Sequence, residues 1–365
     1  MSMTPLTIAA LMVGLVLLVG GAEALVRSAS KLAAAVGISP LVIGLTVVAF
    51  GTSAPELAVS LQASLSDQAG VALGNVVGSN ICNVLLILGI AAIIAPLAVA
   101  QQIVRLDVPI MIGVSGLLML FGWDGRMSRS DGIILLLGGL IYTLFLVYQS
   151  RREKTPSIQV EYAQFSGHAL SWKQVGSSSV LLALGLAMLI GGSQLLVDSA
   201  VTVATVLGAS PLIIGLTVVA VGTSLPELAT SVTASFRGES DIAVGNVVGS
   251  NIFNILVVLG LSSAISPTGI AVSLQAITFD IPIMLAVAVT CLPICITHNQ
   301  ISRREGILLL IYYLLYIGYL AFNLSHENSL IPNWPALVIV PLTLLALALS
   351  GWHFWQTEHG RRSNR

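Results

Sequence analysis

Apolar runs of 18 or more residues recur along almost the whole chain, separated by short polar or glycine-rich stretches. Each run is long enough to cross about 30 Å of hydrocarbon as an α-helix. Eleven such runs are centred near residues 14, 52, 82, 110, 139, 188, 223, 253, 282, 313 and 343. The pattern predicts an all-α polytopic membrane protein that contacts the lipid bilayer over most of its length.

Composition and charge agree with this prediction. Of 365 residues, 56% are apolar and 8% are charged, and the mean hydropathy is +0.97. Soluble domains carry about 25% charged residues, so this chain has too few charges to cover a water-facing surface. The net charge of −1 and the lack of a basic run give no sign of nucleic-acid binding.

The placement of basic residues predicts the orientation, because cytoplasmic loops are enriched in Lys and Arg. With the N-terminus outside, thirteen of the fifteen basic residues face the cytoplasm, and only Arg126 and Arg129 lie outside. The opposite orientation reverses this count. We therefore expect the N-terminus outside and the C-terminus inside.

The chain contains an internal repeat. Residues 39–89 align without a gap to residues 210–260, at an offset of 171, and 33 of the 51 positions are identical. The match extends to the first apolar run, where GLVLLVGG at residues 14–21 recurs as GLAMLIGG at residues 185–192. Coincidence does not produce a match of this length, so the two halves are copies of one unit.

Each copy holds five predicted spans, and an odd number makes the second copy enter the membrane from the opposite face. Two inverted five-helix repeats, with ten core spans in total, are the plan of many secondary transporters. The predicted divisions are a first repeat at residues 1–149, a cytoplasmic linker at 150–173 and a second repeat at 174–323. Residues 324–365 hold the eleventh, C-terminal span and a basic cytoplasmic tail.

Two motifs occur in both copies. The first is GTSAPE at residues 51–56, repeated as GTSLPE at residues 222–227. The second is GNVVGSNICN at residues 74–83, repeated as GNVVGSNIFN at residues 245–254. Both motifs lie inside apolar runs, so their polar groups are predicted at membrane depth.

The first motif places Glu56 and Glu227 at equivalent positions of the two copies. A carboxylate inside an apolar span costs several kcal/mol, with estimates from about 2.5 upwards, and such residues are functional in most cases. Inversion of the repeat brings the two glutamates towards one point. A satisfied structural carboxylate is the alternative interpretation at each position.

A proline precedes each glutamate and is expected to break the helix. Pro55 and Pro226 have no amide hydrogen to donate, so they leave the carbonyl oxygens of Gly51 and Gly222 free. Free carbonyls at membrane depth are tolerated only where they line a cavity or meet a cation. The motif thus offers a carboxylate, hydroxyls and backbone oxygens within one turn.

These groups are hard oxygen ligands. Ca2+ takes six to eight of them, and two carboxylates neutralise its charge in a low-dielectric site. The second motif adds Ser79 and Asn83, four residues apart on one helical face, and likewise Ser250 and Asn254. A packing seam stabilised by hydrogen bonds is the alternative interpretation of the second motif, and it is favoured for the motif's glycines.

Other intramembrane acidic residues carry weaker signals. Asp107 and Asp280 are repeat-equivalent and precede a proline near the start of a span, which favours helix capping. Glu23 and Asp198 have Gln194 and Arg27 as repeat counterparts, so their charge is not duplicated. None of these residues is expected in the ion site.

At its two motifs the sequence resembles the sodium/calcium exchanger family, whose alpha-repeats they match, and the resemblance covers residues 4–323. It implies an antiporter exchanging Na+ for Ca2+, with four ion loci at the centre of the second, third, seventh and eighth spans. By position, it implies Ca2+ ligands at Glu56, Glu227 and the backbone oxygens of Thr52 and Thr223. It implies Na+ loci at Ala49, Thr52, Ser79 and Glu56, and at Ala220, Thr223, Ser250 and Glu227. A central locus would join the glutamates with Asn83 and Asn254, and Ser53 and Ser224 would support the ligands from behind.

The resemblance also bears on the branch of the family. Some prokaryotic members and the K+-dependent branch carry Asp at the position of Asn254, so the neutral amide here argues against K+ co-transport. The proton-coupled branch has a GNxxEH pattern where this chain has Gly78-Ser79 and Gly249-Ser250. We expect a prokaryotic protein of the inner, or cytoplasmic, membrane.

Two further functions stay open on the residues alone. A glutamate of raised pKa could accept a proton in place of Na+, which would give an H+-coupled antiporter of the same fold. A cation channel could use the two glutamates for selectivity, although two broken helices that meet from opposite sides favour an occluding site. An enzyme is not expected, because no nucleophile–base pair and no soft-metal cluster is present, and no cofactor is expected beyond the transported ions.

Overall fold

The computed structural model describes residues 5–36, 38–66, 69–152, 172–206, 220–296 and 299–325. Most of the predicted linker and the whole eleventh span lie outside these residues. The first copy consists of α1 (Pro5–Val36), α2 (Pro40–Ile43), η1 (Gly44–Val48), α3 (Ala49–Thr52), α4 (Ala54–Leu65), α5 (Ala69–Cys82), η2 (Asn83–Leu88), α6 (Gly89–Ile94), β1 (Leu97–Ala98), η3 (Ile103–Asp107), α7 (Val108–Phe121), β2 (Arg126–Met127) and α8 (Arg129–Arg152), where η marks a π-helical turn.

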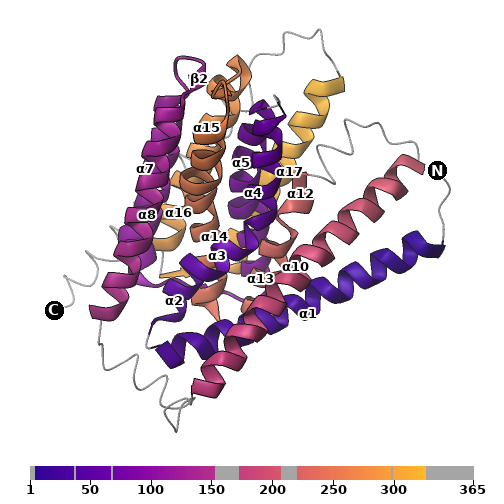
Figure 1. The fold of residues 1–365 in the computed structure, drawn as a ribbon, viewed down its shortest axis with the longest axis vertical. Helices are drawn as coiled ribbons and strands as arrows, with labels where there is room; N and C mark the ends of the chain where they lie inside the picture. The colour runs from indigo at the N-terminus through magenta and orange to yellow at the C-terminus, as the bar shows by residue number, and fades with distance from the viewer. Residues whose placement is uncertain are drawn as a thin grey trace.

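The second copy follows the same order in its described residues, and the counterparts of α2 and η1 lie outside them. Figure 1 shows the helices of both copies. It consists of α10 (Trp172–Val206), α12 (Ala220–Thr223), α13 (Leu225–Phe236), α14 (Ser240–Phe253), η5 (Asn254–Leu259), α15 (Gly260–Ile265), β3 (Ile270–Ala271), η6 (Ala276–Asp280), α16 (Ile281–Ile296), β4 (Gln300–Ile301) and α17 (Arg303–Ser325). A π-helical turn follows the second motif in both copies, at Asn83 and at Asn254.

Seven helices of the described residues are long and apolar enough to cross a membrane, or eight when the bent pair at residues 40–65 counts as one span. This number confirms a helical membrane protein. The expected spans near residues 223, 313 and 343 are not among them, although α17 covers residue 313. The ten or eleven spans and the orientation therefore stay predictions.

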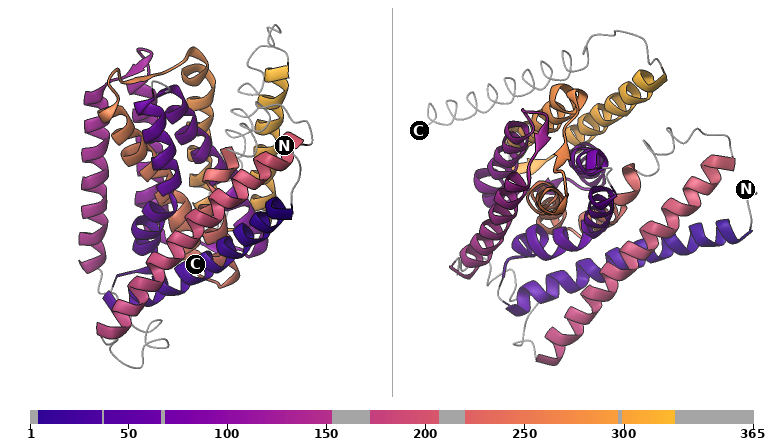
Figure 2. Two further views of the ribbon diagram at one scale, coloured as in Figure 1. Left: turned by 45° about the vertical axis from the view of Figure 1, so that its right-hand side comes forward. Right: turned by 45° about the horizontal axis from the view of Figure 1, so that its top comes forward.

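Helices α1 and α10 pack on each other and cross the rest of the molecule obliquely (Figure 2). Their contact uses the duplicated glycine segment. A Cβ atom at Gly14 would lie 2.9 Å from the Gly192 carbonyl oxygen, and one at Gly21 would lie 2.8 Å from the Gly185 oxygen. Only glycine allows backbones to approach this closely, so the repeat builds its own α1–α10 interface.

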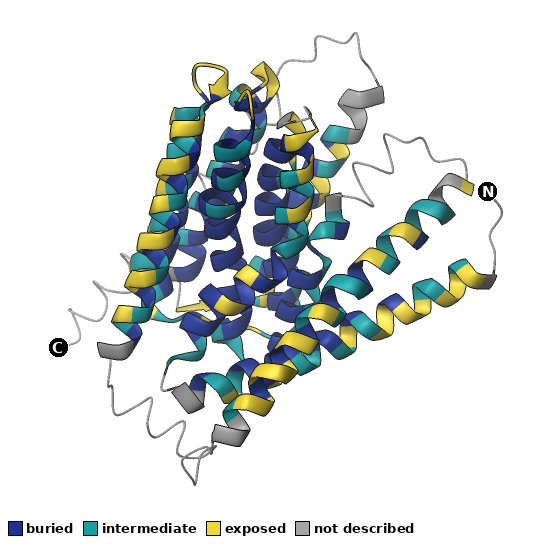
Figure 3. Cartoon of the chain, in the orientation of Figure 1, coloured by how far each residue is buried: buried dark blue, intermediate teal, exposed yellow. Residues whose placement is uncertain are grey.

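The centre of the molecule is formed by the two helices that carry the second motif (Figure 3). Within an 18-residue apolar stretch of the span Ser240–Ile265, 94% of the residues are buried, and the corresponding share in Gly70–Ile94 is 72%. In the α1 and α10 spans it is 28%. The polar second motif therefore lies at the molecular core, and the outer faces of α1 and α10 are apolar, as lipid contact requires.

Two short antiparallel ribbons join the copies. Strand β1 pairs with β4, with Leu97 opposite Ile301, and β2 pairs with β3, with Met127 opposite Ile270. Each ribbon takes one strand from each copy, so the two ribbons are related by the repeat. Strands β1 and β3 follow the two central spans, and β2 and β4 follow α7 and α16, so each ribbon links a central span to the segment after α7 or α16.

The capping role expected for Asp107 is wrong. Asp107 stands at the start of α7, but its side chain caps no backbone amide there. Instead, its carboxylate accepts hydrogen bonds from the Tyr142 hydroxyl at 3.0 Å and from the Gln102 amide at 3.3 Å. A phenol from another helix satisfies the buried acid, and this interaction cannot be read from local spacing.

Candidate ion-binding site

The first motif breaks its helix in both copies. The helical segment Pro40–Thr52, which ends with α3, and the helix α4 are bent by 46° at Ser53. Ser224 stands at the equivalent break between α12 and α13. Glu56 and Glu227 lie in the first turn of the helices that start after the breaks. The N-terminal end of a helix carries a partial positive charge, which favours a carboxylate at both positions.

Each glutamate is hydrogen-bonded to the break of the other copy. The Ser53 hydroxyl donates to Glu227 Oε1 at 3.0 Å, and the Ser224 hydroxyl donates to Glu56 Oε1 at 3.1 Å. Both glutamate side chains are 0% exposed. The structure thus brings the two copies of the motif together at the molecular centre.

The serines of the second motif lie beside the glutamates, but not in the same way. The Ser79 hydroxyl donates to Glu56 Oε1 at 3.4 Å and accepts a hydrogen bond from the Ser224 hydroxyl at 3.3 Å. The hydroxyl of Ser250, the counterpart of Ser79, is buried near Glu227 and has no hydrogen-bond partner among the described residues. The two halves of the site are therefore related but not identical.

Asn75 belongs to this network, although the sequence analysis did not place it among the site residues. Its side-chain amide donates to the Glu56 backbone oxygen at 3.2 Å and to the Ser60 hydroxyl at 3.0 Å. Its Oδ1 accepts from the Thr223 hydroxyl of the other copy at 3.5 Å. Its presence in both copies of the GN dipeptide was the signal that could have identified it.

Asn246 makes the same contacts in the second copy. Its amide donates to the Glu227 backbone oxygen at 3.3 Å and to the Ser231 hydroxyl at 3.0 Å, and its Oδ1 accepts from the Thr52 hydroxyl at 3.1 Å. Each asparagine therefore joins the glutamate helix of its own copy to the threonine of the other. Both helix breaks are held by these links.

The backbone oxygens in and just before the first motif are less available than the sequence predicted. The Gly222 carbonyl, expected to be free, accepts a hydrogen bond from the Ser193 hydroxyl of α10 at 2.7 Å. The carbonyl of Ala49, an expected Na+ ligand, accepts from the Ser53 amide at 3.0 Å and from the Thr52 hydroxyl at 3.3 Å. Only the backbone of Ala220, its counterpart, lies within the described part of the chain.

Several oxygen atoms of the site have no hydrogen-bond partner among the described residues, although they are buried. They are Oε2 of Glu56 and of Glu227, Oδ1 of Asn83 and of Asn254, and the hydroxyl oxygen of Ser250. A buried polar atom without a partner costs free energy, and a buried carboxylate costs more. A cation that accepts these oxygens as ligands would remove the cost.

The chemistry of this donor set is uniform. Every donor atom is oxygen, two of the groups are carboxylates, and the others are neutral amides and hydroxyls. Within the described residues, no group of three or more His, Cys, Asp and Glu side chains could hold a metal ion. The arrangement suits Na+ or Ca2+, which prefer oxygen, better than a transition metal.

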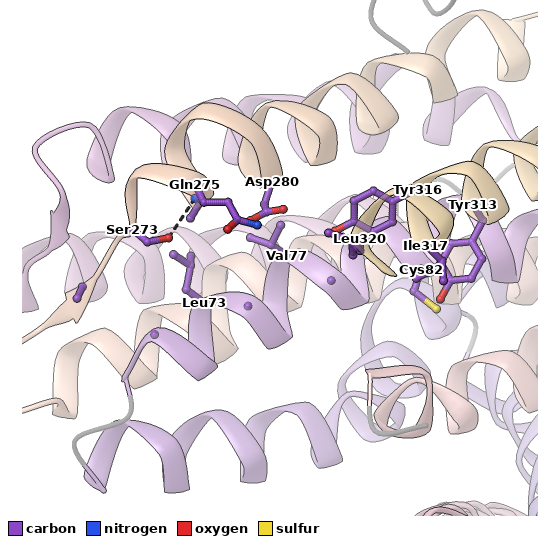
Figure 4. A pocket seen from close by; sticks show the side chains of 15 residues that line it. Leu73, Val77, Cys82, Ser273, Gln275, Asp280, Tyr313, Tyr316, Ile317 and Leu320 are labelled. Carbon is purple, nitrogen blue, oxygen red and sulfur yellow. Dashed lines mark hydrogen bonds between the residues drawn. The ribbon is translucent and has the colours of Figure 1, made fainter. Parts of the chain in front are cut away.

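A cavity of about 360 Å³ lies beside this centre, between α5, η6 and α17. Its described lining includes Cys82, one residue before Asn83, and also Asp280 and Tyr316 (Figure 4). The counterparts of these last two in the first copy, Asp107 and Tyr142, are joined by a hydrogen bond. The molecule is therefore asymmetric here as well.

The comparison with known protein families agrees with this geometry. A sequence model described as sodium/calcium exchanger protein matches residues 6–151 and 177–322, which are the two copies of the repeat. The chain belongs to the sodium/calcium exchanger family. This match confirms the resemblance inferred from the two motifs. Members of an exchanger family are transporters rather than enzymes.

Prokaryotic relatives of this exchanger-family chain match over most of their length. It is 43% identical over 310 residues to the inner membrane protein YrbG of Escherichia coli, covering 83% of this chain and 93% of that protein. It is 33% identical over 341 residues to the sodium/calcium exchanger MaX1 of Methanosarcina acetivorans, covering 84% and 96%. The putative antiporter CaxA of Alkalimonas amylolytica is 40% identical over 317 residues, covering 86% and 97%.

Solved structures show the same fold. The sodium-calcium exchanger NCX_Mj, soaked with zero Na+ and Ca2+, has a TM-score of 0.74 and 32% identity, and the match covers 87% of this chain and 100% of that chain. NCX_Mj soaked with 2.5 mM Na+ and 10 mM Sr2+ gives a TM-score of 0.75 at 32% identity, covering 87% and 99%. This exchanger-family chain is thus a helical membrane protein of the class that transports sodium and calcium.

Proposed function

We propose that the chain is a secondary active antiporter that exchanges Na+ for Ca2+ at a single site formed around Glu56 and Glu227. One observation carries the proposal. Each of these buried glutamates uses one carboxylate oxygen to accept from a serine of the other copy and leaves the second oxygen without a described partner. Two buried carboxylates held in this way require positive charge.

The charges of the site favour these ions. One Ca2+ balances two carboxylates, whereas three Na+, the number that family resemblance implies, leave one net positive charge. Both ions bind hard oxygen atoms, so they would compete for the same ligands around Glu56 and Glu227. The site then holds one load or the other, which is the condition for exchange.

The repeat supports an alternating-access mechanism. In inverted-repeat transporters, one part of the molecule moves against the other around a fixed midplane site. Here the α1–α10 pair packs on itself through glycines and lies outside the buried α5–α14 centre. We propose that this pair moves relative to the centre and exposes the site to one side of the membrane at a time.

The other expected ligands keep the roles that the resemblance implies. We propose that Thr52 and Thr223 contribute to Ca2+ binding, and that Asn83 and Asn254 complete the central locus. The Na+ loci would add the remaining expected positions, which are Ala49, Ser79, Ala220 and Ser250. Ser53 and Ser224 orient the glutamates. The similarity to an inner membrane protein favours the inner membrane of a prokaryote as the location.

The test is radiolabelled Ca2+ uptake into proteoliposomes loaded with Na+ and diluted into Na+-free buffer. We expect uptake that requires internal Na+ and that is lost in Glu56→Gln and in Glu227→Gln. Asp124→Asn, which removes an exposed carboxylate outside the site, is the matched control and should keep wild-type uptake.

The alternative functions give different results in the same assay. Uptake driven by a pH gradient and indifferent to Na+ would indicate an H+-coupled antiporter of this fold. Uptake that needs no counter-ion would indicate a channel. Either result would refute Na+/Ca2+ exchange.

A further inference from the structure

Two asparagines of the second motif, Asn80 and Asn251, face each other across the contact between α5 and α14. The Asn80 side-chain amide donates to the Asn251 backbone oxygen at 3.2 Å, and the Asn251 amide donates to the Asn80 backbone oxygen at 3.4 Å. Both side chains are 2% exposed. The pair forms a reciprocal bridge between the two copies.

This bridge fixes the direction of both side chains. A carboxamide has one face that donates and one that accepts, and its two orientations are normally assigned from the hydrogen-bond network. A backbone carbonyl oxygen can only accept. The NH2 group of Asn80 must therefore point to the Asn251 carbonyl, and its Oδ1 must point elsewhere.

The second N–H of each amide is also used. The Asn80 amide lies 3.7 Å from the sulfur of Met284, and the Asn251 amide lies 3.4 Å from the sulfur of Met111. Thioether sulfur is a weak acceptor and not a donor. Both neighbours of each NH2 group are thus acceptors, which reinforces the same orientation.

The fixed oxygen atoms are received by the next asparagine of the other copy. The Asn254 amide donates to Asn80 Oδ1 at 3.0 Å, and the Asn83 amide donates to Asn251 Oδ1 at 3.0 Å. The NH2 groups of Asn83 and Asn254 are thereby held in the bridge. Their own Oδ1 atoms are left over, buried and without a described partner.

The orientation of the Asn83 and Asn254 amides decides which partial charge a cation at the central locus would meet. An amide that faced the central locus with its NH2 group would present partial positive charge and repel Na+ or Ca2+. One that faces it with Oδ1 presents a ligand. Nothing in an isolated asparagine favours the second orientation, so the bridge supplies the difference.

We propose that Asn80 and Asn251 are positioning residues for cation binding. Each makes the asparagine of the opposite copy, Asn254 and Asn83 respectively, act as a hydrogen-bond donor towards it and as an oxygen ligand towards the central locus. The coupling runs crosswise between the copies and not along one helix. This inference rests on the proposed ion site.

The crosswise pattern gives a test that a merely structural role would not pass. We would measure the Na+ and Ca2+ concentrations that half-saturate the rise in unfolding temperature of the purified protein in detergent. Asn80→Leu keeps the branched shape of the side chain but removes its three hydrogen bonds. It should raise these concentrations about five- to tenfold, the effect of one hydrogen bond on the ion ligand.

The double variants decide between coupling patterns. Asn80→Leu combined with Asn254→Ala should bind no more weakly than Asn254→Ala alone, because the first residue acts through the second. Asn80→Leu combined with Asn83→Ala is the matched control on the same helix. In this control, the fold-changes in ion affinity of the two single variants should multiply to within about twofold, as for independent sites.

The mirror set, Asn251→Leu with Asn83→Ala and with Asn254→Ala, repeats the test should one variant fail to fold. The inference would be overturned if the fold-changes in ion affinity multiplied in both crosswise pairs. It would also be overturned if Asn80→Leu and Asn251→Leu left ion affinity unchanged. Neither result would affect the proposed function. Ion binding without Na+-driven Ca2+ uptake would overturn the proposed function, and the double variants would still decide the inference. A wild-type protein that neither ion stabilises would overturn both.

Discussion

Ser53 and Glu227 come from opposite copies of the repeat, yet the serine hydroxyl lies 3.0 Å from the carboxylate oxygen. Ser53 is only three residues from Glu56, the glutamate of its own copy. The helix break turns Ser53 away from this neighbour and towards the other motif. The two carboxylates are therefore oriented by the assembled repeat and not by either copy alone.

Replacing Ser53 or its counterpart Ser224 tests how much this orientation of the carboxylates contributes to Ca2+ binding. We expect Ser53→Ala and Ser224→Ala each to raise the KM for Ca2+ about tenfold or more, because a hydrogen bond to a charged group is worth about 1.5–3 kcal/mol. The measurement is Ca2+ uptake against external Ca2+. Ser53→Thr keeps a hydroxyl and should stay close to the wild type, and an equal loss in this variant would contradict the explanation.

Asn75 and Asn246 hold the two helix breaks, so their loss should be seen first in stability. Asn75→Ala removes amide hydrogen bonds to the Glu56 backbone and to Ser60. Each buried group left unpaired costs about 1–3 kcal/mol, so the unfolding temperature in detergent should fall, and Asn246→Ala should behave alike. Gln101→Ala, at an exposed helical position outside the site, is the comparison and should have the smaller effect.

Gly249 is placed where a side chain has no room. A Cβ atom there would lie 2.7 Å from the Leu45 carbonyl oxygen and 2.8 Å from the Leu45 Cα atom. Gly249→Ala should therefore force α14 away from η1 and lower stability by about 1–3 kcal/mol. Gly113→Ala, with no atom within 4 Å of the added methyl group, should leave thermal unfolding almost unchanged. Equal behaviour of the two variants would refute the packing argument.

The hydrogen bond from Ser193 to the Gly222 carbonyl ties α10 to the second helix break. Its repeat counterpart is Ala22, which cannot form such a bond. Ser193→Ala should weaken this tie by about 1 kcal/mol and so shift the balance between inward- and outward-open protein about fivefold. Accessibility of a cysteine introduced beside the site, measured from each side of the membrane, would detect the shift. An unchanged ratio would show that the bond is neutral to transport.

The repeat made much of the architecture predictable. The 171-residue offset pairs Glu56 with Glu227, and the prolines place a helix break before each, where the structure has a 46° bend in the first copy. These predictions depend only on the residues within each motif, and the motif occurs in both copies. The role of each expected residue as an ion ligand stays a prediction.

The contacts between copies could not be predicted in the same way. Spacing alone does not show that Ser53 pairs with the distant glutamate, that Tyr142 binds Asp107, or that a serine of α10 occupies the Gly222 carbonyl. Each contact depends on how helices far apart in sequence pack. Asn75 and Asn246 were overlooked for the same reason, since their partners include the threonine of the other copy.

A second polar tie joins α1 to the end of α13, from Arg237 Nε to Glu23 Oε2 at 2.7 Å. Like the Ser193 bond, it has no repeat counterpart, because Ser66 and Gln194 occupy the equivalent positions. In a perfectly symmetric exchanger, the inward-open and outward-open forms would be equally stable. Both ties join the α1–α10 pair to the α12–α13 segment of the second copy. Under the proposed alternating access, a few substitutions after duplication would give this exchanger a preferred side of the membrane, although its ion site is built from two copies of the same motifs.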